Sequence, residues 1–454
     1  MTELKRPNCG ARLDRLPDSG WHWSMFGMVA FALLVCWSNA IGGLVLAQLK
    51  TLGWTNNSIS AMFVALTTAG MFLGALVGGI IGDKIGRKNG FLLFEAIHII
   101  SMIAGALSPN MTFLIACRFV MGFGLGALLV TLFAGFTEYM PARNRGTWSS
   151  RVSFIGNWSY PVCSLIAMGI VLVVSPEMNW RVQFVIPSIL SLIATIIAYK
   201  KFPESPRWLE SKGRFEEAEK IMSAIEAKVE ADKGIKLPPV ADTVDEVQHN
   251  LPYSALFKGA LFKRVVLGSM VLIAMNVVQY TLINWLPTLF MAQGINLKDS
   301  IVLNTMSMFG APTGIFIAMF IMDRLPRKVM GVGLLVIIAV LGYVYSLQTS
   351  MTMISIMGLF LIIFVYMFVC YASAVYVPEI WPTEAKLRGS GLANAVGRIS
   401  GIIAPYVVAT LLDSMGVTGV FLFLSGVSIV VALSIAVLGI ESRGASVEQI
   451  SVAK

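Results

Sequence analysis

The chain has 454 residues, of which 56% are hydrophobic and 13% are charged, and its mean hydropathy is +0.77. Soluble domains carry roughly a quarter of charged residues, so this composition excludes an ordinary water-soluble protein. The net charge of +9 does not indicate nucleic-acid binding, because the basic residues gather in short connections between apolar blocks.

The apolar residues form twelve blocks, each of about 20 to 28 residues, which is the length that crosses a bilayer core. We expect the helices at about 24–49, 58–81, 90–108, 111–137, 148–174, 182–202, 264–291, 300–322, 329–348, 352–377, 389–412 and 418–440. The predicted fold class is all-α: a polytopic membrane protein with twelve transmembrane helices in two six-helix halves.

Basic residues precede the first block and follow the second, fourth, eighth and tenth, whereas the alternate connections are almost uncharged. Because positive loops stay in the cytoplasm, this pattern predicts that both termini are cytoplasmic. The expected domains are an N-terminal tail (1–23), an N-terminal bundle (24–202), a helical cytoplasmic linker (203–263), a C-terminal bundle (264–440) and a C-terminal tail (441–454).

The two halves contain the same motifs. "GDKIGRK" (82–88) corresponds to "MDRLPRK" (322–328), and "EYMPARNRG" (138–146) corresponds to "EIWPTEAKLRG" (379–389). The aspartates of the first pair are 240 residues apart and the glutamates of the second are 241 apart. Such a parallel repeat is typical of a transporter with its substrate site between the halves.

These motifs, together with "RFVMGFGLG" (118–126), "PESPRW" (203–208) and "ESRGASVE" (441–448), resemble the sugar-porter branch of the major facilitator superfamily. The resemblance implies a secondary transporter that works by alternating access in a bacterial inner membrane. It implies no cofactor, and a monomer suffices because one chain holds both halves. The cysteines and histidines show no metal-site spacing, so we expect no metal.

The resemblance also implies that charges at the cytoplasmic helix ends latch the halves together in the outward-open state. The alternative is that these charges only set the orientation of the helices in the membrane or form a solvated surface. The latch candidates are Asp83, Arg87, Lys88, Glu138, Arg145, Glu204, Asp323, Arg327, Glu379, Arg388 and Glu441.

The chain departs from the sugar porters inside the membrane. Ser38 and Asn39 stand where proton-coupled members carry an aspartate, so Arg118 lacks its usual partner. The family's paired glutamine positions in helix 7 hold Ala274 and Met275. The sugar-recognition set is therefore largely missing.

Other polar and aromatic residues occupy the helix middles. Arg118 and Arg398 could together bind a carboxylate, while amides pair with hydroxyls and aromatic rings contact a carbon skeleton. A structural role for Arg118 is the alternative. The binding candidates are Trp37, Asn39, Arg118, Ser153, Asn157, Tyr160, Gln279, Tyr280, Asn284, Trp285, Asn394 and Arg398.

Glu95 and His98 lie three residues apart on one helix face. A buried acid beside a histidine can relay protons, although a structural hydrogen-bonded pair is the alternative. The sequence thus predicts a transporter of a small organic anion, such as a sugar acid, with a co-transported proton and the lipid bilayer as its partners. A neutral sugar or polyol porter is the close alternative; a non-transporting sensor, a multidrug exporter and an enzyme fit the motifs less well.

Overall fold

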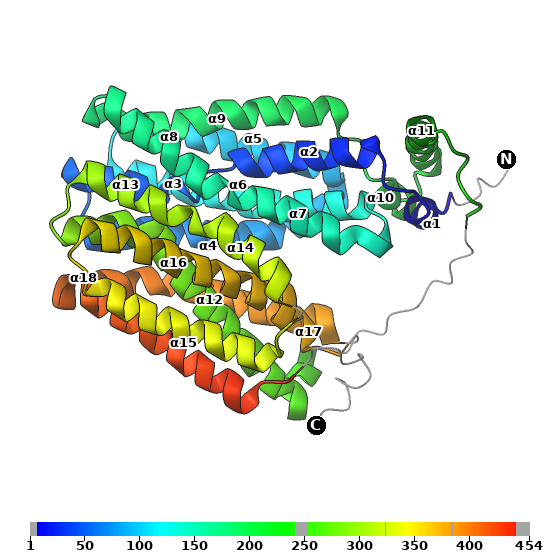
Figure 1. Cartoon of the computed structure of the whole chain (residues 1–454). Coiled ribbons are helices and arrows are strands. Elements are labelled where there is room, and N and C mark those ends of the chain that lie inside the picture. Colours follow the sequence, from blue (N-terminus) through cyan, green and yellow to red (C-terminus); the bar gives the residue numbers. More distant parts are fainter. Residues whose placement is uncertain (1–6, 241–252, 323, 383–384, 442–454) are drawn as a thin grey trace.

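The structure, a computed structural model, describes residues 7–240, 253–322, 324–382 and 385–441. In those ranges it is built from helices, and the long ones run side by side (Figure 1). Ten of the described segments are long and apolar enough to cross a membrane. The last of them holds two spans, because Gly416 has a non-helical φ of 66° and divides α18 (Lys386–Leu438). Helices α2 (Gly20–Val35) and α3 (Ile41–Thr51) together supply the first, so the prediction of twelve transmembrane helices is confirmed.

The N-terminal half contains α2 to α9 and the C-terminal half contains α12 to α18. Their remaining helices are α4 (Asn57–Ile85), α5 (Arg87–Ala106), α6 (Met111–Tyr139), α7 (Arg145–Asn157), α8 (Ser159–Val173), α9 (Pro176–Lys201), α12 (Gly259–Ala292), α13 (Leu297–Met308), α14 (Gly310–Ile321), α15 (Arg327–Ser346), α16 (Met351–Cys370) and α17 (Val377–Glu379).

Several spans are not regular α-helices throughout. The first span is not helical between Val35 and Ile41, and the tenth contains a π-helical stretch at Tyr371–Tyr376. Interruptions of this kind free backbone groups, which a membrane protein tolerates where they are buried or line a cavity. The break in the first span lies beside the cavity described below.

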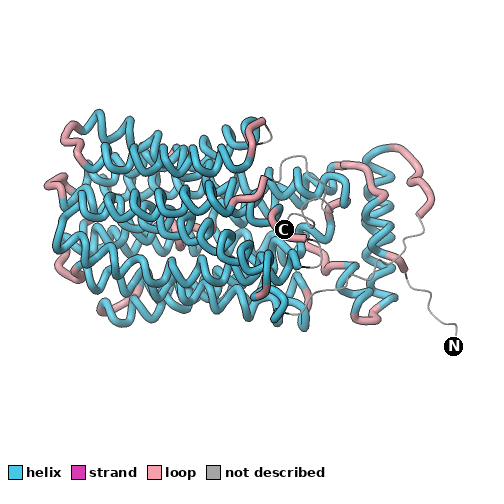
Figure 2. Tube along the Cα trace, turned by 90° about the horizontal axis from the view of Figure 1, so that it is seen from below, coloured by secondary structure: helices cyan, strands magenta, loops and turns pink. Residues whose placement is uncertain are grey.

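Three short helices gather at one end of the bundle, here called the linker end (Figures 1 and 2). They are α10 (Pro206–Ser211) and α11 (Phe215–Lys233) of the linker, and α1 (Cys9–Asp14), which lies within the expected N-terminal tail. Arg12 joins α1 to α11 through ion pairs with Glu219 at 2.5 Å and Glu226 at 2.7 Å.

Small residues let α4 and α6 pack backbone against backbone. A Cβ atom added to Gly74 would lie 2.0 Å from the carbonyl oxygen of Phe123, and one added to Gly126 would lie 2.1 Å from that of Met71. In the other half, a Cβ atom on Gly314 would lie 2.3 Å from the Ile363 oxygen. Close approach at these glycines is how helices associate in lipid, where hydrophobic burial supplies little drive.

The two halves meet tightly at the end opposite the linker helices, here called the far end. A Cβ atom on Gly43 of α3 would lie 2.6 Å from the Ile283 oxygen of α12. Asn304 donates a hydrogen bond to the Ser164 hydroxyl at 3.1 Å, and the Asn57 amide donates to Asp413 at 2.5 Å. These contacts close the far end.

Candidate substrate cavity

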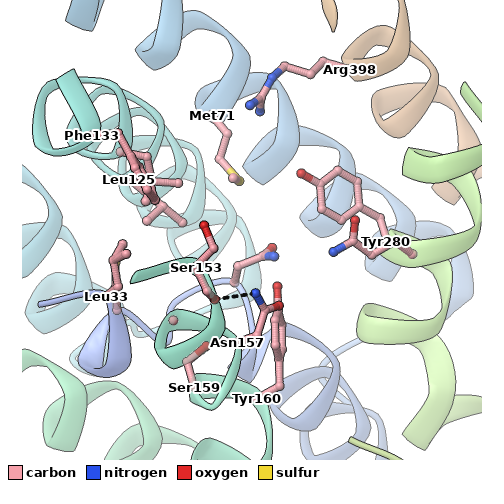
Figure 3. A pocket seen from close by; sticks show the side chains of 15 residues that line it. Leu33, Met71, Leu125, Phe133, Ser153, Asn157, Ser159, Tyr160, Tyr280 and Arg398 are labelled. Carbon is pink, nitrogen blue, oxygen red and sulfur yellow. Dashed lines mark hydrogen bonds between the residues drawn. The ribbon is translucent and has the colours of Figure 1, made fainter. Parts of the chain in front are cut away.

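A cavity of about 260 Å³ lies between the two halves in the middle of the bundle. One side is formed by α4, α6, α7, α8 and the region around the break in the first span, and the other by α12 and α18. Figure 3 shows Arg398 directed into it across from Ser153, Asn157 and Tyr160. The lining residues are Leu33, Cys36, Asn39, Met71, Leu125, Leu129, Phe133, Ser153, Gly156, Asn157, Ser159, Tyr160, Gln279, Tyr280 and Arg398.

Arg398 is the one charged residue among the described residues that line the cavity. Within the described part of the chain, no hydrogen bond or ion pair holds its guanidinium. A half-buried cation with no protein counter-ion leaves its donors available to a ligand. The cavity therefore offers a positive charge that a bound anion could neutralise.

Amides and hydroxyls surround this charge. Asn157 uses its amide to donate to the Ser153 carbonyl at 2.8 Å, which fixes its side chain on the wall (Figure 3). Asn39, Gln279 and Tyr280 add further donors and acceptors. One face of α6 adds apolar side chains that continue toward the linker end: Leu125, Leu129 and Phe133. The cavity thus extends away from the closed far end.

Seven of the twelve binding candidates lie in this lining and five do not. Trp285 and Asn284 are buried in α12, where the Asn284 amide donates to the Tyr280 carbonyl at 2.9 Å. Trp37 is buried and donates to the Leu34 carbonyl. Asn394 is exposed on α18 and donates to the Ser390 carbonyl at 2.9 Å. The fifth is Arg118.

Arg118 is only 1% exposed and is held by neighbouring protein groups. Its Nε donates to the Thr67 hydroxyl at 3.2 Å, and one Nη donates to the carbonyl of Ser38 in the break. The guanidinium also lies 4.7 Å from the ring centre of Phe63. These contacts replace the missing carboxylate partner with a backbone carbonyl, a hydroxyl and an aromatic face.

Glu95 and His98 are buried on α5 behind the same break. His98 Nδ1 lies 3.6 Å from a Glu95 oxygen, and its Nε2 lies 2.8 Å from the Ser38 hydroxyl. Asn39, the next residue, lines the cavity. Glu95, His98 and the Ser38 hydroxyl therefore form a row of groups behind the cavity wall, in which His98 is hydrogen-bonded to Ser38 and Glu95 lies just beyond hydrogen-bond distance of His98.

The charges at the linker end pair within each half. In the N-terminal half, Arg87 binds Glu138 at 2.8 Å, and its backbone N–H donates to Glu204 at 2.6 Å. In the C-terminal half, Arg327 binds Glu379 at 3.0 Å, and its N–H donates to Glu441 at 2.8 Å. The two halves thus repeat one arrangement of an arginine and two glutamates.

The other latch candidates have varied surroundings. Asp83 receives a bond from Arg87 at 2.5 Å, and the Lys88 N–H donates to Glu204 at 3.1 Å. Arg145 lies 3.8 Å from Asp14, and Arg388 lies over the Tyr253 ring. Asp323 is outside the described residues.

Sequence reasoning missed eight lining residues: Leu33, Cys36, Met71, Leu125, Leu129, Phe133, Gly156 and Ser159. Most are apolar, and in a chain with so many apolar residues such side chains carry no signal that separates cavity from lipid. Only Ser159, between two candidates, could have been found by its position.

Comparisons with known proteins agree with this architecture. The family of sugar (and other) transporters matches residues 37–453. The metabolite transport protein YdjK of Escherichia coli (strain K12) is 74% identical over 453 residues, covering 100% of this chain and 99% of that protein. The inner membrane metabolite transport protein YdjE of the same organism is 44% identical, covering 97% and 98%.

Among solved structures, the partially occluded inward-open xylose transporter XylE from E. coli matches with a TM-score of 0.73 at 18% identity. It covers 94% of this chain and 100% of XylE. The relatives and the fold are those of transporters, not of enzymes. The chain therefore belongs to the sugar-transporter family of the major facilitator superfamily, and is a multi-pass inner-membrane transporter of metabolites.

Proposed function

We propose that this protein transports a small organic anion, such as a sugar acid or another hydroxylated or aromatic carboxylate. The observation that carries the proposal is Arg398, the one charged residue among the described residues that line the central cavity. Its planar guanidinium can donate two parallel hydrogen bonds to the two oxygens of one carboxylate. A neutral substrate would leave this cation without a counter-charge.

The remaining lining supports a substrate that also has hydroxyl groups or a ring. Asn39, Asn157 and Gln279 can pair with hydroxyls, and Tyr160 and Tyr280 offer aromatic faces. A relative, the niacin transporter NiaP of Acinetobacter baylyi, is 28% identical over 97% of this chain. Niacin is an aromatic carboxylic acid, which fits this chemistry.

A neutral sugar or polyol is the second candidate. It is favoured by the amides of the lining and by relatives such as a probable inositol transporter of Arabidopsis thaliana, 27% identical over 64% of this chain. The fold of XylE, a xylose transporter, points the same way. The two candidates differ in whether Arg398 contributes to binding.

Transport in this proposal proceeds by alternating access, with the linker end in the cytoplasm. The far end is closed by contacts between the halves, and the cavity extends toward the linker end, which suits an inward-facing state. Closing the linker end would bring the Arg87–Glu138 and Arg327–Glu379 groups together as the latch. The ligand drives the cycle only by its differential affinity for the states.

Coupling to protons is assigned to Glu95, His98 and Ser38. The Glu95 carboxylate lies 3.6 Å from one nitrogen of the His98 ring, and the other ring nitrogen lies 2.8 Å from the Ser38 hydroxyl. Ser38 directly precedes Asn39, which lines the cavity. Arg118 then has a positioning role, since it holds the Ser38 carbonyl from the other side.

The deciding experiment is ligand-induced thermal stabilisation of the purified protein by glucuronate and by glucose, as a matched acid and neutral sugar. We expect glucuronate to stabilise the wild type and glucose not to. Arg398→Gln should weaken acid binding about tenfold to a hundredfold, because a charge-assisted hydrogen bond contributes about 1.5–3 kcal/mol.

Asn394→Ala is the matched control, because Asn394 lies one turn away on α18 and outside the cavity lining. It should behave as the wild type. Stabilisation by glucose that persists in Arg398→Gln would instead support the neutral-sugar candidate.

A further inference from the structure

Tyr366 of α16 lies behind the wall of the central cavity and is not among its lining residues. Its side chain is 1% exposed, and its hydroxyl oxygen is buried with no described group in hydrogen-bonding geometry. A hydroxyl in this situation is unfavourable, because it has lost its hydrogen bonds to water and has gained none from the protein. Such groups are rare in folded proteins and need an explanation.

The surroundings of this hydroxyl connect it to the cavity. It lies near the polar groups of Tyr160, Gln279 and Tyr280, all of which line the cavity. Tyr160 also packs against Tyr366, with ring centres 5.7 Å apart and ring planes inclined by 64°. Since Tyr160 belongs to α8 and Tyr366 to α16, this contact joins the two halves. The Tyr366 hydroxyl is therefore separated from the cavity only by side chains that line it.

The position of this hydroxyl suits the end of a substrate that points away from the charge. Tyr160 lies across the cavity from Arg398 (Figure 3). A carboxylate bound to Arg398 would direct the rest of the molecule toward Tyr160 and Gln279. A substrate hydroxyl there can donate one hydrogen bond and accept another, and so can pair with Gln279 and Tyr366 together. An unsubstituted ring or carbon chain would leave the Tyr366 oxygen unpaired.

We propose that Tyr366 determines substrate specificity by forming a hydrogen bond with a hydroxyl group of the substrate. The substrate is then a hydroxylated carboxylic acid, and an acid with an unsubstituted ring or chain is a poor one. This inference rests on the proposed transport of an organic anion and narrows its substrate class. A site built to pair with a hydroxyl group rejects analogues that lack it, because their binding leaves its polar groups unpaired.

The test compares glucuronate with cyclohexanecarboxylate, an acid that has a six-membered ring and no hydroxyl group. Binding to the purified full-length protein is measured from the dependence of the melting temperature on ligand concentration. We expect the wild type to prefer glucuronate. Tyr366→Phe removes only the hydroxyl group, and should weaken glucuronate binding about threefold to tenfold while leaving cyclohexanecarboxylate binding unchanged. Its melting temperature without ligand should equal that of the wild type or exceed it, because an unpaired buried hydroxyl is gone.

Tyr345→Phe is the matched control, because Tyr345 is also a buried tyrosine whose hydroxyl has no described partner. Its ring packs against Phe290 and Phe421, neither of which lines the cavity, so it should bind both acids as the wild type does. Unchanged glucuronate binding in Tyr366→Phe would overturn the proposal. Equal weakening of both acids would overturn it too, because it would show a structural role. Arg398→Gln tests the anion proposal separately, since it should weaken both acids.

Discussion

At the scale of single residues, the most informative change is Glu95→Gln. Glutamine keeps the size of the side chain but cannot take up a proton, so the row of groups through His98 to Ser38 loses its acid. We expect accumulation driven by a proton gradient to be abolished while exchange of substrate across the membrane continues. Transport into proteoliposomes measures both.

Ser101→Ala is the control for Glu95→Gln, since Ser101 donates to the His98 carbonyl at 2.9 Å without joining that row. Its accumulation should stay near the wild-type level. Unchanged accumulation in Glu95→Gln would dismiss the coupling role and leave Glu95 and His98 as a buried structural pair.

The polar part of the cavity could be predicted from the sequence, because amides and charges inside apolar blocks are costly and therefore stand out. Arg398 and Asn157 are examples, and both line the cavity. The same argument could not separate Arg398 from Arg118, because both are single arginines in apolar helices. The difference lies in the break of the first span, whose Ser38 carbonyl receives Arg118, and no residue pattern predicted that break.

At the scale of elements, α4 and α6 depend on glycines that approach a backbone. Gly74→Ala should lower the thermal stability measured in detergent, since overpacking costs about 1–3 kcal/mol and its new Cβ would meet the Phe123 oxygen at 2.0 Å. Gly79→Ala on the same helix should be tolerated, because the nearest atom, on Val130, would be 4.0 Å away. Equal melting temperatures of the two variants would contradict this account.

The docking of α1 on α11 is a second element with a clear test. Arg12 holds two carboxylates, and Cys9 beside it is buried. Burial and the neighbouring Glu210 carboxylate raise the pKa of the Cys9 thiol to about 12, which keeps it unreactive at neutral pH. Arg12→Ala should release α1 and speed alkylation of Cys9 about tenfold, because its partly buried pairs with Glu219 and Glu226 contribute more than the roughly 1 kcal/mol of an exposed pair and less than the roughly 3 kcal/mol of a buried one.

Arg214→Ala is the control for Arg12→Ala. It removes an exposed ion pair, with Glu217 at 2.6 Å, and should leave the alkylation rate of Cys9 unchanged, because such pairs contribute little. Equal rates in both variants would show that the Arg12 pairs do not hold α1.

Acid should act like Arg12→Ala. Burial raises the pKa of Glu226, but hydrogen bonds from Arg12 and Arg15 outweigh it and the net pKa is lowered; the bond from Arg12 likewise lowers the pKa of Glu219. Their stabilisation of α1 is therefore present above the ordinary glutamate pKa of about 4.3 and is lost as the pH falls through the lowered values. Hydrogen exchange of residues 9–14, corrected for intrinsic rates, should show protection at pH 7 that disappears below about pH 4.

At the scale of the whole molecule, the two repeated motif pairs predicted two six-helix halves, and the ion pairs of Arg87 and Arg327 repeat accordingly. How the two halves are placed against each other could not be predicted in this way. It depends on contacts between residues that lie outside the repeated motifs. Asn304 with Ser164 and Gly43 with Ile283 are such contacts. They decide which end of the cavity is closed.

If the halves rock about the cavity, fixing the far end must stop transport. Asn57 of α4 and Asp413 of α18 lie in different halves, and their side chains meet at 2.5 Å on an exposed surface. In the double variant Asn57→Cys and Asp413→Cys, oxidation should form a disulfide that abolishes uptake, and a reducing agent should restore it. Oxidising either single variant should leave uptake unchanged. An oxidant that cannot cross the membrane should act from the periplasm, because the far end faces that side when the linker is cytoplasmic. Full uptake by the crosslinked protein would mean that the far end need not open, and alternating access between these halves would have to be abandoned.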